Sequence, residues 1–319
     1  MKNKILVIGA SGQIGTELVI KLRDIYSGET VIASDITVPS YEVMESGPFE
    51  LLNILYENDI RKVMQKHAVS QVYLLAAFLS ATAEQHPEAA WNLNINGLLN
   101  VLESCREQNI AKVFWPSSIA VFGPSTPKNN TPQNTIMDPV TVYGISKLAG
   151  ERWCEYYFLK YGIDCRSLRY PGLVGYKSNP GGGTTDYAVH IFHAALKKKS
   201  YECFLSDDTV LPMMYMPDAI EATVGLMEAD AKKLSVRSSY NIAGMSFSPN
   251  ELADEIKTHI PDFICTYKPD NRQKLASGWP RSIDDSAAKK DWGWKPTHNL
   301  SNMTIDMLDH LQLRKEITA

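Results

Sequence analysis

The 319-residue chain has few cysteines, no long apolar run and little net charge. Its five cysteines are odd in number and form no C-x-x-C pair, so we expect reduced thiols in a cytoplasmic protein. No apolar stretch approaches the ~20 residues that a membrane-spanning helix needs. A formal net charge of −4 leaves no basic footprint for nucleic acid. The composition therefore argues against membrane and nucleic-acid partners.

Internal repeats, low-complexity linkers and metal-ligand spacings are also lacking. The seven histidines show no such spacing, so His190 and His193 are expected to be helix residues without a chemical role, and no metal is expected. Because an apolar strand begins almost at Met1, we expect no secretory signal. The length accommodates a nucleotide-binding domain and a smaller second domain.

The first apolar run leads directly into a glycine-rich turn. Residues 4–8 read Lys-Ile-Leu-Val-Ile, a short and mostly apolar run with β-branched residues, as is typical of a buried parallel strand. Residues 9–15 read Gly-Ala-Ser-Gly-Gln-Ile-Gly and precede apolar residues at helical spacing. Strand, turn and helix together bring backbone N–H groups and the positive helix end to a pyrophosphate. This order predicts a dinucleotide site.

The second strand ends in an acid. Residues 30–35 form a β-branched run that closes on Asp35, 20 residues after Gly15. A carboxylate at this place accepts hydrogen bonds from the adenosine ribose and repels a 2′-phosphate. We therefore predict NAD and not NADP.

Strands and helices alternate through the first half of the chain. The expected strands continue at 49–53, 71–75, 111–115 and 164–170, with helices at 58–67, 87–108 and around Tyr143. This alternation predicts an α/β fold, a Rossmann-like doubly wound parallel sheet. Ligands of such sheets lie beyond the carboxyl ends of the strands, where residues 76–80, Ser117 and Ser118 are expected.

Tyr143 and Lys147 stand four residues apart, so a helix places them on one face, one turn apart. A free phenol titrates near ~10 and is a poor base at neutral pH. A nearby ammonium favours the phenolate and should lower the phenol pKa towards the range of efficient proton transfer. The spacing predicts an acid–base pair.

After Tyr170 the pattern loosens. Residues 171–175 and 179–186 are expected to be loops, 187–199 a helix, and Ser248 a helix cap with Glu251 completing a capping box. We predict an NAD-binding domain over 1–170, rejoined by about 207–236. A smaller C-terminal substrate-binding domain is predicted over 171–206 and 237–319, covering the site from above.

These motifs, with Ser117-Ser118 before Val-Phe-Gly, resemble the extended short-chain dehydrogenase/reductase family from Met1 to about Tyr170. Further stretches widen the resemblance to nearly the whole chain and narrow it to the short-chain type of L-threonine 3-dehydrogenase: Leu-Arg-Tyr-Pro-Gly at 168–172, residues 183–188, residues 211–218 and Trp279-Pro280. It implies a homodimer that oxidises the β-hydroxyl of L-threonine to 2-amino-3-oxobutyrate with NAD⁺.

The resemblance also implies roles. Tyr143 would be the base, and Lys147 would lower its pKa and bind the nicotinamide ribose. Ser117 and Ser118 compete as the residue that holds the reacting oxygen; the resemblance favours Ser118, and Ser117 would then cap a turn. The expected cofactor-binding residues are Gly9, Gly12, Gln13, Ile14, Gly15, Asp35, Ile36, Leu52, Asn53, Leu75, Ala76, Ala77, Asn94, Tyr143, Lys147 and Tyr170. The expected substrate-binding residues are Ser80, Ser118, Tyr143, Thr184, Thr185 and Trp279. Asn53 stands where relatives often carry an acid near the adenine amine.

Two other functions remain open from the residues. A sugar-nucleotide epimerase or dehydratase shares the fold, the cofactor and the tyrosine, but needs cationic clamps on a diphosphate. Arg272 and Arg281 are the candidates for such clamps. A non-catalytic NAD-binding sensor is the alternative from another class, although such proteins often lose the tyrosine or the lysine, and both are present here.

Overall fold

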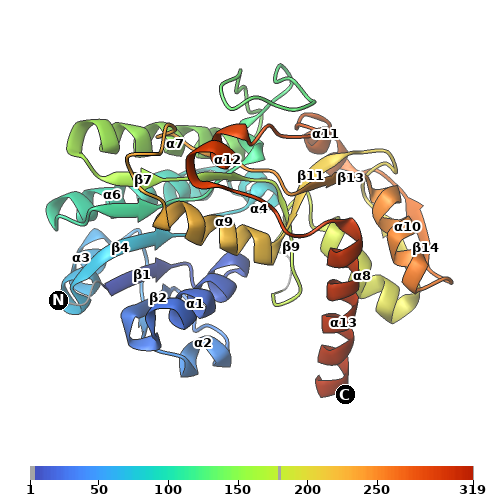
Figure 1. Ribbon diagram of the computed structural model, residues 1–319, viewed down its shortest axis with the longest axis horizontal. Helices are drawn as coiled ribbons and strands as arrows, with labels where there is room; N and C mark the ends of the chain where they lie inside the picture. The colour runs from blue at the N-terminus through green and yellow to red at the C-terminus, as the bar shows by residue number, and fades with distance from the viewer. Residues whose placement is uncertain (1–3, 179–180, 319) are drawn as a thin grey trace.

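A computed structural model describes residues 4–178 and 181–318. Asn179 and Pro180 of the predicted 179–186 loop lie outside the described residues, as do the outermost residues of both predicted domains, 1–3 and 319. The chain forms a first lobe around one large sheet and a second lobe built from later segments (Figure 1).

The main sheet has six parallel strands in the order β3-β2-β1-β4-β5-β7. They are β1 (Lys4–Ile8), β2 (Val31–Asp35), β3 (Phe49–Leu51), β4 (Val69–Leu74), β5 (Lys112–Phe114) and β7 (Asp164–Arg166). Side chains of β1 alternate between two apolar clusters, one on each face. The predicted doubly wound α/β sheet is confirmed.

Helices cover both faces of this sheet. One cluster joins the sheet to α1 (Gln13–Tyr26) and α9 (Met216–Glu228), which also contact each other. The other joins it to α3 (Glu57–His67), α6 (Gly97–Glu107) and α7 (Val142–Tyr161). Thus α9 returns to the first lobe from far along the chain, as Figure 1 shows.

Short elements complete the first lobe. They are η1 (Gly28–Thr30), α2 (Tyr41–Glu45), α4 (Ser80–Gln85), α5 (Pro87–Trp91), the π-helical turn η2 (Asn92–Asn96), β6 (Ser117–Ser118) and the 3-10 turn η3 (Ile119–Val121). The predicted strand at 164–170 is divided: β7 belongs to the main sheet, while β8 (Leu168–Tyr170) lies between β6 and β12 (Tyr240–Asn241) in a separate sheet. Residue 167 is where the chain changes partners.

The second lobe contains two small sheets. Strand β11 (Leu211–Tyr215) lies between β9 (Gly172–Val174) and β13 (Met245–Phe247), and β10 (Ser200–Cys203) pairs with β14 (Ile264–Tyr267). The predicted loop at 171–175 was therefore wrong: its three central residues form β9 because β11 supplies hydrogen-bonding partners from distant sequence.

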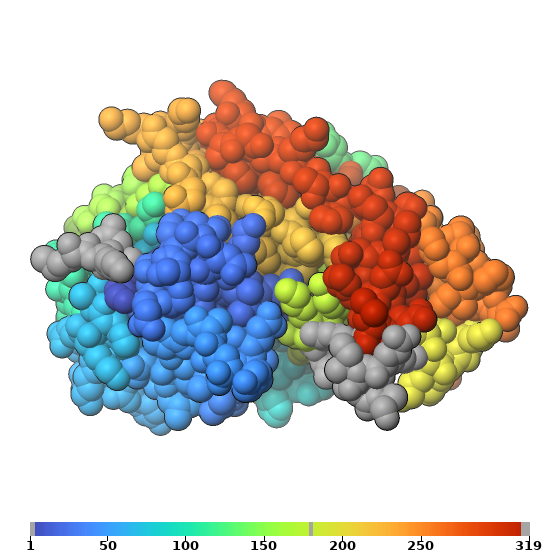
Figure 2. Space-filling view, turned by 60° about the horizontal axis from the view of Figure 1, so that its bottom comes forward, coloured from blue at the N-terminus to red at the C-terminus, as the bar shows by residue number. Residues whose placement is uncertain are grey.

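The helices of the second lobe are α8 (Tyr187–Lys198), α10 (Pro249–His259), α11 (Asn271–Ser277) and α13 (Leu300–Thr318), whereas α12 (Ser286–Trp292) packs on the apolar cluster of α1 and α9 in the first lobe. Ser248 and Glu251 form the predicted capping box at α10. In the space-filling view the blue N-terminal lobe and the orange and yellow second lobe lie at opposite ends, with the red C-terminal helix between them (Figure 2).

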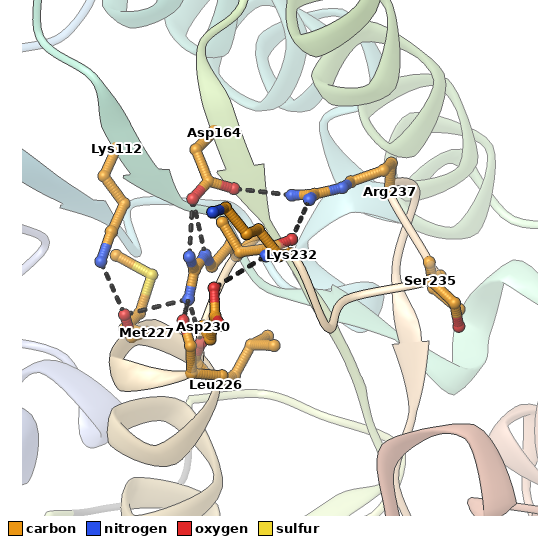
Figure 3. A network of polar contacts seen from close by, with 12 residues as sticks. Lys112, Asp164, Leu226, Met227, Asp230, Lys232, Ser235 and Arg237 are labelled. Atoms are coloured by element: carbon orange, nitrogen blue, oxygen red, sulfur yellow. Dashed lines mark hydrogen bonds and ion pairs between the residues drawn. The ribbon is translucent and has the colours of Figure 1, made fainter. Parts of the chain in front are cut away.

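A polar cluster holds the carboxyl end of α9 against the edge of the sheet (Figure 3). Arg166 donates to the carbonyls of Leu226, Met227 and Ala229, and Lys112 donates to Met227. Asp164 pairs with Arg166 at 2.6 Å and with Arg237 at 2.8 Å. These cations satisfy the last carbonyls of the helix.

Two further findings bear on the protein's surroundings. Among the described residues, no helix has the length and apolarity needed to cross a membrane. All five cysteines are free thiols, and four of them are buried.

Candidate active site

The glycine-rich turn lies between β1 and α1, and close packing requires its glycines. Gly9 has a φ of 91°, and a Cβ there would lie 2.7 Å from the backbone nitrogen of Ala76. A Cβ on Gly15 would lie 2.0 Å from the Gly9 carbonyl oxygen. The N-terminus of α1 has no side-chain cap and no acid in its first turn. Its N–H groups are thus suited to an anion such as a pyrophosphate.

A cleft follows this turn along the carboxyl ends of β1, β2 and β4. It is lined by Ile8, Gly9, Gly12, Asp35, Ile36, Leu52, Asn53, Ile54, Leu75, Ala76, Ala77 and Leu93. The Asp35 carboxylate accepts from the Ser11 and Thr37 backbones at 3.0 and 3.2 Å, which fixes it at the rim. The side-chain oxygen of Asn53 accepts a hydrogen bond from the backbone N–H of Leu55 at 3.0 Å and keeps a second lone pair for another donor.

A second cavity adjoins the cleft, and Leu75 and Ala77 line both. It brings together predicted residues from seven separate stretches: Gln13, Ile14, Ser80, Ser118, Tyr143, Lys147, Tyr170, Thr184, Thr185 and Trp279. A largely apolar cavity with a few convergent polar groups beside a nucleotide cleft is typical of a small-molecule site.

Helix α7 carries Tyr143 and Lys147, and the Thr141 side chain caps its first turn. The Ser118 hydroxyl interacts with the Tyr143 phenol and also accepts from the Ala120 backbone at 3.2 Å. The predicted turn cap is therefore Ser118 itself, whereas the Ser117 hydroxyl donates to the Glu151 carboxylate at 2.6 Å. Of the two serines, only Ser118 interacts with the phenol.

Lys147 is held by the Pro116 backbone and packs on the Trp115 ring. Its ammonium donates to the Pro116 carbonyl at 2.7 Å and lies 4.4 Å from the centre of the Trp115 ring. The distance to the centre of the Tyr143 ring is 5.5 Å. The predicted one-face arrangement places the cation one helical turn from the phenol, with its own hydrogen bond directed elsewhere.

Burial dominates the titration of both groups. It raises the pKa of Tyr143 to about 12, against the opposing effect of Ser118. It lowers the pKa of Lys147 to about 7, with Cys154 and Glu151 acting in the other direction. The net shift of the phenol pKa is upward because burial dominates it, and the predicted lowering of this pKa by Lys147 stays a prediction.

The opposite wall of the cavity comes from the segment before α8. Thr184 is buried, and its hydroxyl lies 3.5 Å from that of Ser80. The Asp186 carboxylate accepts from the backbones of Gly182 and Gly183 at 2.9 and 2.7 Å, and burial raises its pKa. Trp279 is 7% exposed and belongs both to the cavity wall and to the apolar core of the second lobe.

Asn94 and Gly15 line neither the cleft nor the cavity, and Tyr170 lines the cavity with its hydroxyl engaged elsewhere. Asn94, in η2, binds both backbone groups of Phe78 and donates to Ser146 at 3.1 Å, so it supports the chain that enters α4. The Tyr170 hydroxyl is hydrogen-bonded to Thr223 of α9. Gly15 acts through close packing alone. The cofactor roles predicted for these three residues remain predictions.

Asp186 and Glu151 are two charged residues that sequence reasoning did not select. Asp186 directly follows Thr184 and Thr185, which were expected to bind the substrate. Glu151 follows Lys147 by one more helical turn, so its spacing places it on the same helix face, but the sequence does not reveal its partners Arg169 and Ser117.

Comparison with known proteins agrees with this geometry. The family model described as "NAD dependent epimerase/dehydratase family" matches residues 5–243. An uncharacterized epimerase/dehydratase of Staphylococcus haemolyticus is 46% identical over 315 residues, 98% of this chain and 99% of that protein.

Solved structures are similar over the same length. The holo form of a GalE-like L-threonine dehydrogenase from Cupriavidus necator is 56% identical, with a TM-score of 0.94 over 97% of this chain and 99% of that one. A monomeric L-threonine 3-dehydrogenase from a metagenome, in its apo form, is 48% identical, with a TM-score of 0.93 over 97% and 99%. With its glycine turn, cleft and paired tyrosine and lysine, the chain belongs to the NAD-dependent epimerase/dehydratase family.

Proposed function

We propose that this protein oxidises L-threonine at its β-hydroxyl to 2-amino-3-oxobutyrate, with NAD⁺ as the hydride acceptor. The observation that carries the proposal is a single cavity that joins Ser118, Tyr143 and Lys147 to the cleft behind the glycine turn. The relatives named L-threonine dehydrogenases, which match nearly the whole chain, support the substrate.

The residues present suit NAD. The glycine turn and the uncapped start of α1 would hold the pyrophosphate, and Asp35 would receive the adenosine ribose. Tyr143 and Lys147 would lie at the nicotinamide end. When bound, NAD⁺ supplies the redox chemistry, while the protein supplies position and charge.

The chain's own groups divide the proton work. Ser118 orients the substrate hydroxyl, and Tyr143 accepts its proton. Lys147 holds a cation one turn below the phenol, on the Pro116 carbonyl. The buried phenol on its own has a pKa of about 12, so proton transfer needs positive charge near it, and the ammonium of Lys147 is the charge that this chain supplies.

The cavity suits a small zwitterion better than a sugar nucleotide. Within the described chain, its charged lining residues are Lys147 and Asp186, and no arginine lines it. Arg272 is paired with Asp270 and lies over the Phe204 ring, and Arg281 is not a lining residue. The cationic clamps that a diphosphate requires are thus lacking among these residues.

NADH formation decides the proposal. Absorbance near ~340 nm would follow the nicotinamide reduction with L-threonine, L-serine, D-threonine and UDP-sugars in parallel. We expect turnover with L-threonine and its loss, by ~10²–10⁴-fold, in Tyr143→Phe. Tightly bound NAD with conversion of a UDP-sugar would indicate an epimerase instead. NAD binding without turnover of any amino alcohol would indicate a sensor.

We further propose a cytoplasmic homodimer of two-lobed subunits, divided as predicted near residue 170. Buried free thiols support a reducing compartment. Exposed apolar side chains gather on α5 and α7, with Trp91 at 41%, Ile145 at 46%, Trp153 at 38% and Tyr156 at 45% exposure. A groove between these helices includes Trp91 and Ile145. Such a face favours association with a second copy.

A further inference from the structure

A buried ion pair lies directly behind the reaction centre. Glu151 of α7 and Arg169 of β8 pair at 2.8 Å, with side chains 0% and 2% exposed. Arg169 donates from Nε and Nη2 to the two carboxylate oxygens, each at 2.8 Å. The same carboxylate accepts from the Ser117 hydroxyl at 2.6 Å. This geometry joins α7, β8 and β6 through one charged group.

The remaining donor of Arg169 is also satisfied. Its Nη1 donates at 3.0 Å both to the Asn241 side chain and to the Gln133 carbonyl. Gln133 in turn accepts from the backbone of Asn241 at 2.8 Å. A buried pair of charges is rarely kept for stability, because an apolar replacement of similar volume is often neutral or stabilising. This pair therefore needs a reason beyond stability.

Strand geometry supplies one. Ser117 and Ser118 are neighbours in β6, so their side chains point to opposite sides. Glu151 binds Ser117 on one side, and Ser118 interacts with Tyr143 on the other. A rotation of β6 that freed Ser117 would also turn Ser118 away from the phenol. The tether thus fixes the serine on which the reaction depends.

Helix spacing supplies a second reason. Glu151 stands one turn after Lys147 and two turns after Tyr143 on α7. Its negative charge favours the charged form of Lys147 and raises the lysine pKa against burial. The titratable groups that act on Lys147 are Glu151 and Cys154 of α7; Arg169 from β8 pairs with Glu151, and Cys165 from β7 interacts with Cys154.

We propose that the Glu151–Arg169 pair is a positioning element of the reaction centre, which aims Ser118 at Tyr143 through Ser117 and sets a negative charge one turn from Lys147. The inference rests on the proposed function only in taking these three groups as the reacting set. Neither residue touches the cavity, so both act through others.

The first test is Glu151→Gln, which keeps the size of the side chain and removes its charge. We expect kcat to fall by ~10- to 100-fold with KM for L-threonine little changed, as for a slightly misplaced reacting group. The ultraviolet titration of the Tyr143 phenol with NAD⁺ bound, taken against Tyr143→Phe in each background, should move to higher pH. Two effects close to the phenol raise its pKa, because its contact with Ser118 weakens and Lys147 carries less charge. Loss of the Glu151 carboxylate by itself would lower the phenol pKa, but this effect is smaller because the carboxylate lies two turns away.

Companion variants separate charge from geometry. Glu151→Asp keeps the charge but is shorter, so kcat should fall while the titration stays in place. Ser117→Ala removes only the tether and should lower kcat, while Ser104→Ala, which removes a buried hydroxyl without a partner, should not. Asp164→Asn is the matched control for a broken ion pair at the far edge of the sheet. It should lower the melting temperature and leave kcat per folded molecule unchanged.

If Glu151→Gln behaves like Asp164→Asn in kcat, in the phenol titration and in melting temperature, the pair is structural only and the proposal is wrong. If Glu151→Gln does not fold, the double variant Glu151→Gln/Arg169→Gln takes its place in the test, because it leaves no buried charge unpaired. A wild-type kcat in that double variant overturns the proposal. Absence of wild-type turnover with L-threonine would refute the proposed function alone, because the phenol titration needs no substrate and still decides this inference.

Discussion

The Lys147 ammonium is buried in the folded protein and exposed to water in the unfolded chain, so its pKa differs between the two states. Its pKa is 10.5 without burial and about 7 in the fold, so between these values the unfolded chain holds a proton that the folded chain lacks. The free energy of unfolding therefore rises with pH over this window. The contribution of Lys147 is least favourable at and below neutral pH.

The variant Lys147→Met removes this term. We expect the difference in unfolding free energy, wild type minus Lys147→Met, to rise with pH between 7 and 10 by up to about 1.4 kcal/mol per pH unit. Urea unfolding at several pH values measures it, and other groups cancel in the difference. A flat difference would mean that Lys147 keeps its proton when buried.

At the other end of the cleft, Asp35 should set the choice of cofactor. A 2′-phosphate beside its carboxylate would be repelled, and the ribose hydroxyls would lose an acceptor without it. Asp35→Gly should weaken NAD and narrow the gap to NADP, as measured by dissociation constants. Because Asp35 also accepts from the Ser11 and Thr37 backbones, Asp35→Asn is the control that retains packing. Unchanged discrimination in both variants would remove Asp35 from the ribose site.

Among the elements, the segment before α8 carries the most specific substrate prediction. Thr185 lines the cavity beside Asp186 and Trp279, and its hydroxyl can donate to a carboxylate. A lost hydrogen bond to a charged group costs about 1.5–3 kcal/mol, so Thr185→Ala should lower kcat/KM for L-threonine by roughly 10- to 150-fold. The NAD dissociation constant should not change, and Thr185→Ser should retain most activity.

Trp279→Ala tests the same wall from its apolar side. Trp279 is shared by the cavity and the core, so this variant should lose both stability, by about 3–5 kcal/mol, and kcat/KM. Melting and kinetic measurements on the same samples separate the two losses. A silent Thr185→Ala together with a Trp279→Ala that is only less stable would return this wall to a purely structural role.

How far the sequence determined these elements depended on whether their partners were local. The glycine turn, the acid that ends β2 and the helix that carries Tyr143 follow from short-range spacing, and each lies in the structure where it was predicted. Strand β9 was missed because its three residues pair only with β11, about 40 positions away in the chain. Glu151 was missed because its meaning depends on Arg169 and Ser117, which approach it only in the fold.

For the whole molecule, the apolar face of α5 and α7 makes a prediction about assembly. If two copies associate there, Ile145→Glu would bury a charge in the contact and shift the protein to monomers. Ile264→Glu, at a 61%-exposed site on β14, should leave the assembly intact. Sedimentation at micromolar concentration measures both. A monomeric wild type, as in the 48%-identical relative named monomeric, would refute the homodimer.

The position of β8 between β6 and β12 also bears on how the protein is made. On the ribosome, residues 117–118 and 168–170 emerge long before Tyr240 and Asn241. These two later residues form β12, which pairs with the second edge of β8, and Asn241 accepts a hydrogen bond from Arg169. Nascent chains fold from the N-terminus, so the nucleotide cleft can mature while β8 still has an open edge. Chains arrested before and after residues 240–241 should therefore differ in protease sensitivity at β8, and the catalytic machinery should become functional only late in translation.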